Sequence, residues 1–362
     1  MDLYRLDKYI LAKYLKTFLL ALALIIIIVI TFDLSEKLDD FLSHHAPLNK
    51  IVFQYYFNFL PGFVNLYSPL FIFISVLFFT SKMASNTEII AILSSGISYR
   101  RMLRPYLYGS VIVAVVVLIL GNFVIPFSNR TLNDFEEHYV KKRATSYYTN
   151  LHFQSAPNTQ VYAESYDVKQ QRAYQFRREI FDDNGVLVQR EAADLITFDT
   201  ARNNWHCTGY FLRTIDDHGV ETLTNQSNCF VDFGLDPSDL DIKARVIETM
   251  PSNELYSYIQ HEKMRGTGLV KEAKIELFQR LLNPLAIIIM TFIGVSIASR
   301  KSRGGLGIHL AIGITVAFSF IVFMKVTTVF AINGNLSPFM AVLLPQLIYG
   351  IGAFYLVKYA PK

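Results

Sequence analysis

The segment 85–98 holds residue types that suit docking to another protein, in the order Ser-Asn-Thr-Glu-Ile-Ile-Ala-Ile-Leu-Ser-Ser-Gly-Ile-Ser. Ser85 and Glu88 have the spacing of a capping box at a helix N-terminus, and Gly96 is typical of a helix end. The apolar positions between them share one helical face: Ile89, Ile92 and Leu93. The pattern predicts a short amphipathic helix over about 85–97.

Two interpretations of this helix remain open. In the first, its apolar face lies on lipid or against other helices of the chain, and Glu88 only caps the helix. In the second, the helix docks into a groove on a soluble partner, with Ile89 and Ile92 as anchors and Glu88 meeting a basic residue.

A second pair of residues with chemical potential is Cys207 and Cys229, the two cysteines of the chain. They are equidistant from His218, so a hairpin without a bulge would place them opposite each other on two strands. In an oxidising compartment such a pair is a candidate disulfide. One bulge would shift the register and leave two thiols on different faces.

Motifs for catalysis or cofactor binding are missing from the sequence. No Gly-rich loop ends in Gly-Lys-Ser/Thr, and His261-Glu262 is not followed by the second histidine that a zinc site needs. The 34 basic residues are spread over many loops, which argues against nucleic-acid binding. The sequence predicts a non-enzymatic chain with no metal or cofactor of its own.

The elements that carry these residues are predicted mainly by hydropathy. The chain is 52% hydrophobic, and a helix needs about 20 apolar residues to cross a membrane. The first apolar run has no small-residue cleavage site after it, so we expect a retained helix. Six stretches qualify as spans: 17–32, 51–80, 105–129, 281–299, 304–324 and 331–357.

The basic residues of the short loops predict the orientation of these spans. One set of loops and termini holds thirteen Lys and Arg, among them Arg300, Lys301, Arg303 and Lys362. The opposite loops hold only Lys37 and Lys50. Because positive loops stay in the cytoplasm, both termini are predicted to be cytoplasmic and the long segment from about 130 to 270 exported.

Within that exported segment, the pattern from 160 to about 244 changes to short alternating runs separated by turn residues. The turn 182–185 (Asp-Asp-Asn-Gly) and the turn 217–219 (Asp-His-Gly) each predict a β-hairpin, within a sandwich or barrel-like sheet. Ser252 or Asn253 is predicted to cap a helix that runs to about Arg265.

Several of these features together resemble one known family, the LptF/LptG permeases of lipopolysaccharide export (the YjgP/YjgQ family). They are the opening Leu-Asp-Lys-Tyr-Ile at 6–10, the 88–98 segment, a late Trp205 in the β-domain, the linker Met-Pro-Ser-Asn-Glu-Leu at 250–255, and three closing spans. The resemblance covers essentially the whole chain, and its opening leans towards LptG.

The resemblance implies an α+β membrane protein of the inner membrane, with six transmembrane helices and a periplasmic β-jellyroll domain inserted between helices 3 and 4. It divides the chain into 1–129 (helices 1–3), 130–250 (jellyroll), 251–270 (linker helix) and 271–362 (helices 4–6). In that family two permeases pair around a cavity, an LptB ATPase dimer uses the ATP, and the jellyrolls continue into LptC and LptA.

Carried onto this sequence, the resemblance gives the 85–98 segment the role of coupling the ATPase to the spans, through Glu88, Ile89, Ile92, Leu93, Gly96 and Ser98. Lipopolysaccharide combines acyl chains with phosphorylated sugars, so its cavity should pair apolar walls with cations. Lys37 and Lys325 are the candidates. The alternative for Lys37 is a rim residue balanced by Glu36, Asp39 and Asp40. The alternative for Lys325 is a side chain that snorkels to the interface without contact to the cargo. Asp33 is either the counter-ion of Lys325 or a water-exposed helix end.

Three other classes compete with lipid export. A mechanotransmission or lipoprotein-handling subunit of another ATP-linked system also carries an exported domain, usually with fewer spans. A secondary transporter should show ionisable groups near the bilayer midplane, whereas these spans are nearly free of charge. A scaffold or receptor would transport nothing.

Overall fold

A computed structural model describes residues 5–140, 147–216, 219–240, 244–266, 269–299 and 305–360. The chain divides into two compact units, a helical unit (Met1–Val140, Glu248–Asn253 and Lys271–Lys362) and a β-unit (Lys141–Ile247 and Glu254–Val270). Some residues used above for turns and orientation lie outside the described residues: Asp217, His218, Arg300, Lys301, Arg303 and Lys362.

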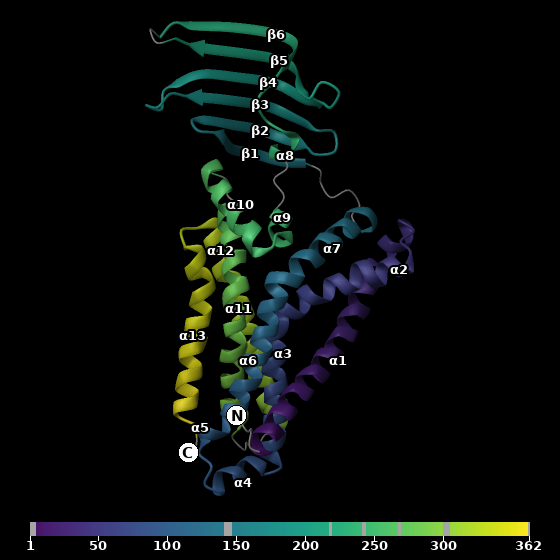
Figure 1. The fold of residues 1–362 in the computed structure, drawn as a ribbon, viewed down its shortest axis with the longest axis vertical. Coiled ribbons are helices and arrows are strands. Elements are labelled where there is room, and N and C mark those ends of the chain that lie inside the picture. The colour runs from purple at the N-terminus through teal and green to yellow at the C-terminus, as the bar shows by residue number, and fades with distance from the viewer. Residues whose placement is uncertain are drawn as a thin grey trace. The chain divides into compact units, whose positions relative to one another are not determined.

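Six helical stretches of the described chain are long and apolar enough to cross a membrane, as predicted. The first is α1 (Figure 1). The second and third are built from several segments, with the short π-helical turns η1 and η2 among them. The bounds are α1 (Arg5–Ser43), α2 (Leu48–Lys50), η1 (Ile51–Tyr56), α3 (Phe57–Ser85), α5 (Tyr99–Met102), α6 (Arg104–Ile119), η2 (Leu120–Val124), α7 (Ile125–Tyr139), α11 (Leu269–Ala298), α12 (Gly305–Asn333) and α13 (Pro338–Lys358).

The sixth span starts later than hydropathy predicts. The prediction began it at residue 331, but α12 continues to Asn333 and α13 begins at Pro338. Ser337 caps α13, because its Oγ accepts a hydrogen bond from the Met340 amide at 3.4 Å. Hydropathy misses this break because both sides of it are apolar, whereas the cap and the proline mark it.

The core of the helical unit joins α1 to α3, α6 and α11. Tyr14 and Tyr106 are fully buried, and their hydroxyls share hydrogen bonds with Thr291 at 3.0 Å and Thr80 at 3.1 Å. A Cβ at Gly109 would lie 2.7 Å from the Tyr14 ring, so the missing side chain lets α1 and α6 approach closely. Small and hydroxyl-bearing residues therefore hold these helices together.

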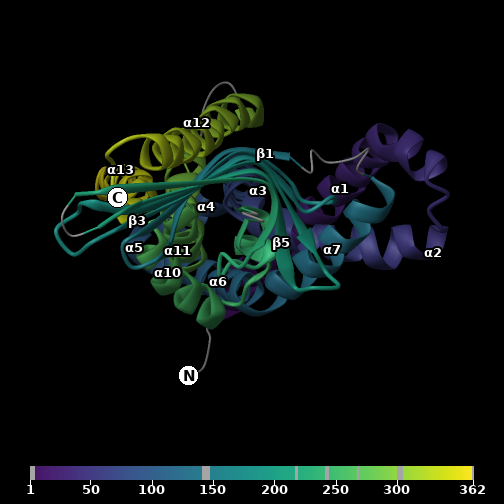
Figure 2. The same ribbon diagram turned by 90° about the horizontal axis from the view of Figure 1, so that it is seen from above.

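The β-unit contains one antiparallel sheet of six strands in sequential order. Figure 2 shows that the sheet is strongly curved. Both predicted hairpins are confirmed, and so is the helix from Ser252 to Arg265. The bounds are β1 (Tyr147–Ala156), β2 (Thr159–Asp167), β3 (Arg172–Phe181), β4 (Leu187–Asp199), β5 (Asn204–Ile215), β6 (Glu221–Val231), α8 (Pro237–Leu240), α9 (Ala244–Thr249) and α10 (Ser252–Arg265).

The fold class is thereby confirmed as an α+β membrane protein, in which the sheet lies in sequence between the third and fourth spans. A sheet of this kind agrees with the expected jellyroll. The turn 182–185 explains one hairpin: the Asp182 Oδ1 accepts the amides of Asn184 and Val186 at 2.9 and 2.7 Å, and Gly185 takes a φ of 81°. A side-chain cap and a glycine with positive φ close this loop.

One face of the sheet covers the core of the β-unit. Trp205 is 1% exposed, and its indole Nε1 donates to the Leu235 carbonyl at 2.8 Å. Phe176, also 1% exposed, packs on Phe233 with ring centroids 4.7 Å apart. Trp205 is the single tryptophan of the chain, so its fluorescence reports on this core alone.

We expect Phe176→Ala to destabilise the β-unit by about 3–5 kcal/mol, because it opens a cavity in a packed core. The measurement is urea unfolding of the full-length protein in detergent, followed by Trp205 fluorescence. Leu223→Ala is the control, since Leu223 is 61% exposed on β6, and it should change the free energy of unfolding by less than ~0.5 kcal/mol. Equal midpoints for the two variants would contradict this account of the core.

Candidate functional site

The α4–α5 segment, residues 86–103, joins α3 to α6 at the end of the helical unit that holds the N-terminus (Figure 1). It contains α4 (Glu88–Ser94), a turn through Gly96 with φ 86°, and α5, which Ser98 caps by accepting from the Arg101 amide at 3.3 Å. The predicted helix end at Gly96 is confirmed. The segment reverses the chain in two short helices.

The predicted capping box of Ser85 and Glu88 is wrong. Ser85 is the last residue of α3, and its hydroxyl donates to the Ser81 carbonyl at 3.0 Å. The residue before α4 is Thr87, with a φ of 60° and no cap from its side chain. Ser85 and Glu88 have the spacing of a capping box, but α3 continues through Ser85. The Ser85 hydroxyl therefore belongs to α3 and does not cap α4.

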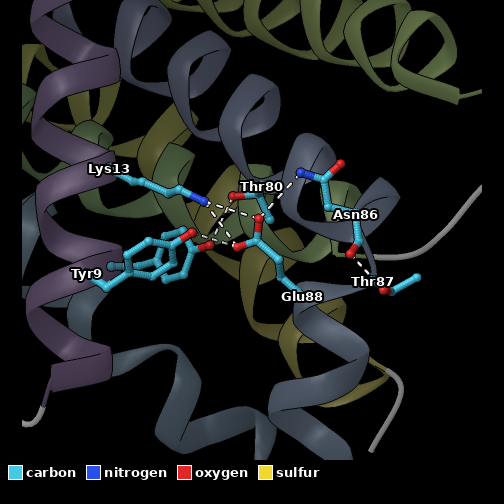
Figure 3. Close-up of polar contacts among 7 residues, drawn as sticks. Tyr9, Lys13, Thr80, Asn86, Thr87 and Glu88 are labelled. Carbon is cyan, nitrogen blue, oxygen red and sulfur yellow. Dashed lines mark hydrogen bonds and ion pairs between the residues drawn. The ribbon is translucent and has the colours of Figure 1, made fainter.

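The Glu88 side chain instead attaches α4 to α1, as Figure 3 shows. The Tyr9 hydroxyl donates to its Oε2 at 2.8 Å, and the Lys13 Nζ lies 3.0 Å from the same oxygen. Asn86 Nδ2 donates to Oε1 at 3.4 Å. Partial burial acts to raise the pKa of Glu88, but the hydrogen bonds from Lys13, Tyr9 and Asn86 outweigh it and hold that pKa below its usual value.

A second attachment lies beside the first. Asp7 is 4% exposed, and its two carboxylate oxygens accept from the Arg101 guanidinium at 2.6 and 2.7 Å. A bidentate pair of this kind fixes orientation as well as distance. Sequence reasoning missed Asp7 and Arg101 as site residues, although Asp7 and Tyr9 both belong to the Leu-Asp-Lys-Tyr-Ile opening. This opening therefore binds both helices of the α4–α5 segment.

The apolar face of α4 is turned into the chain's own core. Ile89 is 2% exposed and packs with Met83, Tyr99 and Met102, while Ile92 and Leu93 are partly buried against the same cluster. The expectation that Ile89 anchors a partner is therefore corrected. The large apolar side chain that α4 exposes is Ile90, at 49%.

The two lysines proposed for cargo differ in their surroundings. Lys37 Nζ lies 3.2 Å from Asp33 and 3.9 Å from Glu136, hydrogen-bonds to Tyr55, and lies over that ring at 4.6 Å. Asp33 is thus the counter-ion of Lys37 and not of Lys325, which corrects the prediction. The acids expected to balance Lys37 were Glu36, Asp39 and Asp40, but one of its partners comes from α7 instead.

Lys325 is exposed on α12 and lines a small cavity of about 70 Å³ between α3, α11 and α12. The polar residues around it are Gln279, Asn283 and Thr328, and the rest of the lining is mostly apolar. No carboxylate belongs to the described lining of this cavity. A cavity of this size is well below the roughly 300–1,000 Å³ of sites that hold drug-sized ligands, so a lipid would meet Lys325 at its exposed surface and not inside the cavity.

The cysteines lie opposite each other, as the hairpin predicted: Cys207 on β5 pairs with Cys229 on β6. Directly opposed residues of an antiparallel pair have Cα atoms within the range that a disulfide spans. Both are thiols in the structure, and burial raises the pKa of Cys207 to about 12. The disulfide stays a prediction.

Among the described residues, no group of three or more His, Cys, Asp or Glu is placed to hold a metal ion. The described fold, with six apolar spans, an inserted β-sheet unit and a short helix fixed to the first span, defines a multi-pass membrane protein. The family model described as "Lipopolysaccharide export system permease LptF/LptG" matches residues 8–359. The chain belongs to this family, and so to the lipopolysaccharide export system of the inner membrane.

A comparison with curated proteins gives no match. The family model covers LptF and LptG together. The lean towards LptG stays a prediction.

We expect Asp7→Asn to weaken the hold of α1 on α5, because a half-buried Arg101 loses its charged partner. The cost should be about 2–4 kcal/mol, measured as a lower midpoint of thermal unfolding of the full-length protein. The exchange Asp7→Arg with Arg101→Asp should recover part of the loss, which a non-specific effect at residue 7 would not allow.

Proposed function

We propose that this chain is the permease subunit of an ATP-driven exporter that extracts lipopolysaccharide from the outer leaflet of the inner membrane and passes it to a periplasmic bridge. Membership of the LptF/LptG family supports this proposal. The chain itself is non-catalytic and binds no cofactor, and an LptB-like ATPase dimer hydrolyses the ATP. Its other partners are a second LptF/LptG-type permease and LptC-like and LptA-like periplasmic proteins.

The orientation follows the positive loops. Both termini and the α4–α5 segment lie in the cytoplasm, and the β-unit lies in the periplasm as the first section of the bridge. The basic residues Lys82, Arg100, Arg101 and Arg104 flank or belong to the α4–α5 segment, which supports this assignment.

The observation that carries the proposal is the double attachment of the α4–α5 segment to α1, through Glu88 and through Arg101. A force that the ATPase exerts on α4 reaches α1 directly through these contacts. In its most apolar stretch only 6% of the residues of α1 are buried. The helix therefore offers its middle to lipid or to the second permease, and its movement changes the wall of the cavity between them.

In this proposal the cargo contacts the exposed face of α12. Lys325 supplies a cation near the periplasmic end of α12, where exposed residues such as Phe318, Val322 and Phe330 provide apolar contact for acyl chains. Lys37 plays a structural part, because Asp33 and Glu136 already neutralise it.

We expect Glu88→Ala to uncouple ATP hydrolysis from lipopolysaccharide release in the reconstituted complex. The ion pair between Glu88 and Lys13 is partly exposed and contributes about 1 kcal/mol or less to stability. The α4–α5 segment should therefore stay folded in this variant, while its attachment to α1 loosens. Lys13→Ala should reproduce the uncoupling and leave co-purification of the ATPase intact. Glu137→Ala, which removes an exposed acid of α7, is the matched control.

Two results would contradict this route. If Glu88→Ala uncouples the complex and Lys13→Ala does not, Glu88 acts on the ATPase itself and not through α1. If both variants hydrolyse ATP and release lipopolysaccharide normally, the attachment has only a structural role.

The second test concerns the cargo. Lys325→Ala should lower photo-crosslinking of lipopolysaccharide to α12 and its export several-fold, because removal of the cation leaves a phosphate without its partner. Lys37→Ala is the contrast: its charge is already paired, so crosslinking at α12 should not change. Unchanged crosslinking and export in Lys325→Ala would remove Lys325 from the cargo site.

A further inference from the structure

A cavity of about 910 Å³ opens beside the α4–α5 segment, between α5, α6, α11 and α13 of the helical unit. The helices α4 and α5 beside it lie at the end of that unit near the N-terminus (Figure 1). Its volume is in the range of sites that hold a lipid- or drug-sized molecule. Leu93, Gly96 and Ser98 of its lining are among the residues expected to couple the ATPase, but the proposed transport route places no ligand in it.

The walls of this cavity are apolar on the side of the membrane spans. Leu107 of α6, Phe292 of α11, and Phe354 and Val357 of α13 line it. Phe354 is 66% exposed and Leu107 37% exposed, on helices that cross the membrane. The cavity therefore opens sideways, towards the acyl chains of the surrounding bilayer.

Three cations line the other side: Arg100, Arg104 and Lys358. All three side chains are exposed, whereas Arg101 between the two arginines turns to Asp7. Among the described residues that line the cavity, none is Asp or Glu. The positive charge is therefore not balanced from within the cavity.

The arginines stand on a backbone that is held in place. Tyr99 and Leu103 are 7% and 5% exposed, and the Tyr99 hydroxyl lies 3.4 Å from the Ser299 Oγ of α11. Tyr99 and Leu103 are buried on one side of the helical stretch 99–104, so Arg100 and Arg104 lie on its exposed side. The backbone that carries the two arginines is thus fixed before any ligand arrives, which lowers the part of the entropy cost of binding that comes from ordering the chain.

We infer that this cavity binds one anionic phospholipid, with its phosphate among Arg100, Arg104 and Lys358 and an acyl chain along Leu107, Phe292 and Phe354. A zwitterionic phospholipid also carries a phosphate, but its ammonium group would lie near the same three cations with no acid of the described lining to balance it. A small soluble anion would leave the apolar walls in contact with water. Under the proposed orientation the lipid comes from the cytoplasmic leaflet, opposite the leaflet that supplies the cargo. It packs against Leu93 and Ile97, so it ties the α4–α5 segment to the membrane.

The first test needs no variant. Native mass spectrometry of the full-length protein in detergent, with equal amounts of phosphatidylglycerol and phosphatidylcholine of the same acyl chains, should show one retained phosphatidylglycerol in at least about tenfold preference. Photoactivatable phosphatidylglycerol should label peptides that contain Leu107 or Phe354. Equal retention of both lipids, or labelling confined to other helices, would overturn the inference.

The second test removes the charge. Arg100→Ala with Arg104→Ala should weaken phosphatidylglycerol retention roughly 25-fold, since each cation near a membrane surface contributes about fivefold. Lys8→Ala with Lys16→Ala is the matched control, because it removes two exposed cations from α1 at the same end of the unit and should leave retention unchanged. Equal losses in the two double variants would mean a general charge effect and contradict a specific site.

A third arm separates a lipid from a soluble anion. Glycerophosphoglycerol, the same headgroup without acyl chains, should compete poorly at millimolar concentration, and Phe354→Ala should lower retention of the intact lipid several-fold. Full competition by the headgroup would show that the cavity takes a soluble phosphate ester, and the inference would be wrong.

Discussion

The attachment of the first turns of α1 to the α4–α5 segment is the interaction on which the other features of the helical unit depend. α4 and α5 have seven and four residues, too few to be stable helices alone. They keep their positions because Ile89, Tyr99 and Met102 are buried in the core and because Glu88 and Arg101 bind α1. The position of α4, the direction of Arg100 and the shape of the cavity beside α5 follow from this arrangement.

Charged side chains hold α1 at both ends, and few residues of its apolar middle are buried. Asp7 and Lys13 bind the α4–α5 segment near its start, and Asp33 and Lys37 join a cluster with Tyr55 and Glu136 towards its end. Between them, only 6% of the residues in its most apolar stretch are buried, whereas half or more of the corresponding stretches of the second and fourth spans is buried. In the proposed function, a helix fixed in this way would transmit movement along its length and still offer a surface to lipid or to another permease.

The corrections share one cause, which is that local patterns do not say what lies across the fold. The spacing of Ser85 and Glu88 fits a capping box, but α3 runs through Ser85, and α1 offers Glu88 stronger partners. The periodicity of Ile89, Ile92 and Leu93 identifies an apolar face without saying whether a partner or the chain itself covers it. Asp33 similarly has Lys37 four residues away on the same helix, which outweighs the more distant Lys325.

The sequence by itself determined the six spans, the inserted sheet with its two hairpins, the opposition of Cys207 and Cys229, and the family, because hydropathy, turn residues and motif order are properties of neighbouring positions. Only the tertiary structure decided that Asp7 and Tyr9 hold residues about 80 to 95 positions away, and that Arg100, Arg104 and Lys358 meet around one cavity. Contacts between side chains so far apart in the chain depend on how the helices pack, and no local spacing encodes that packing.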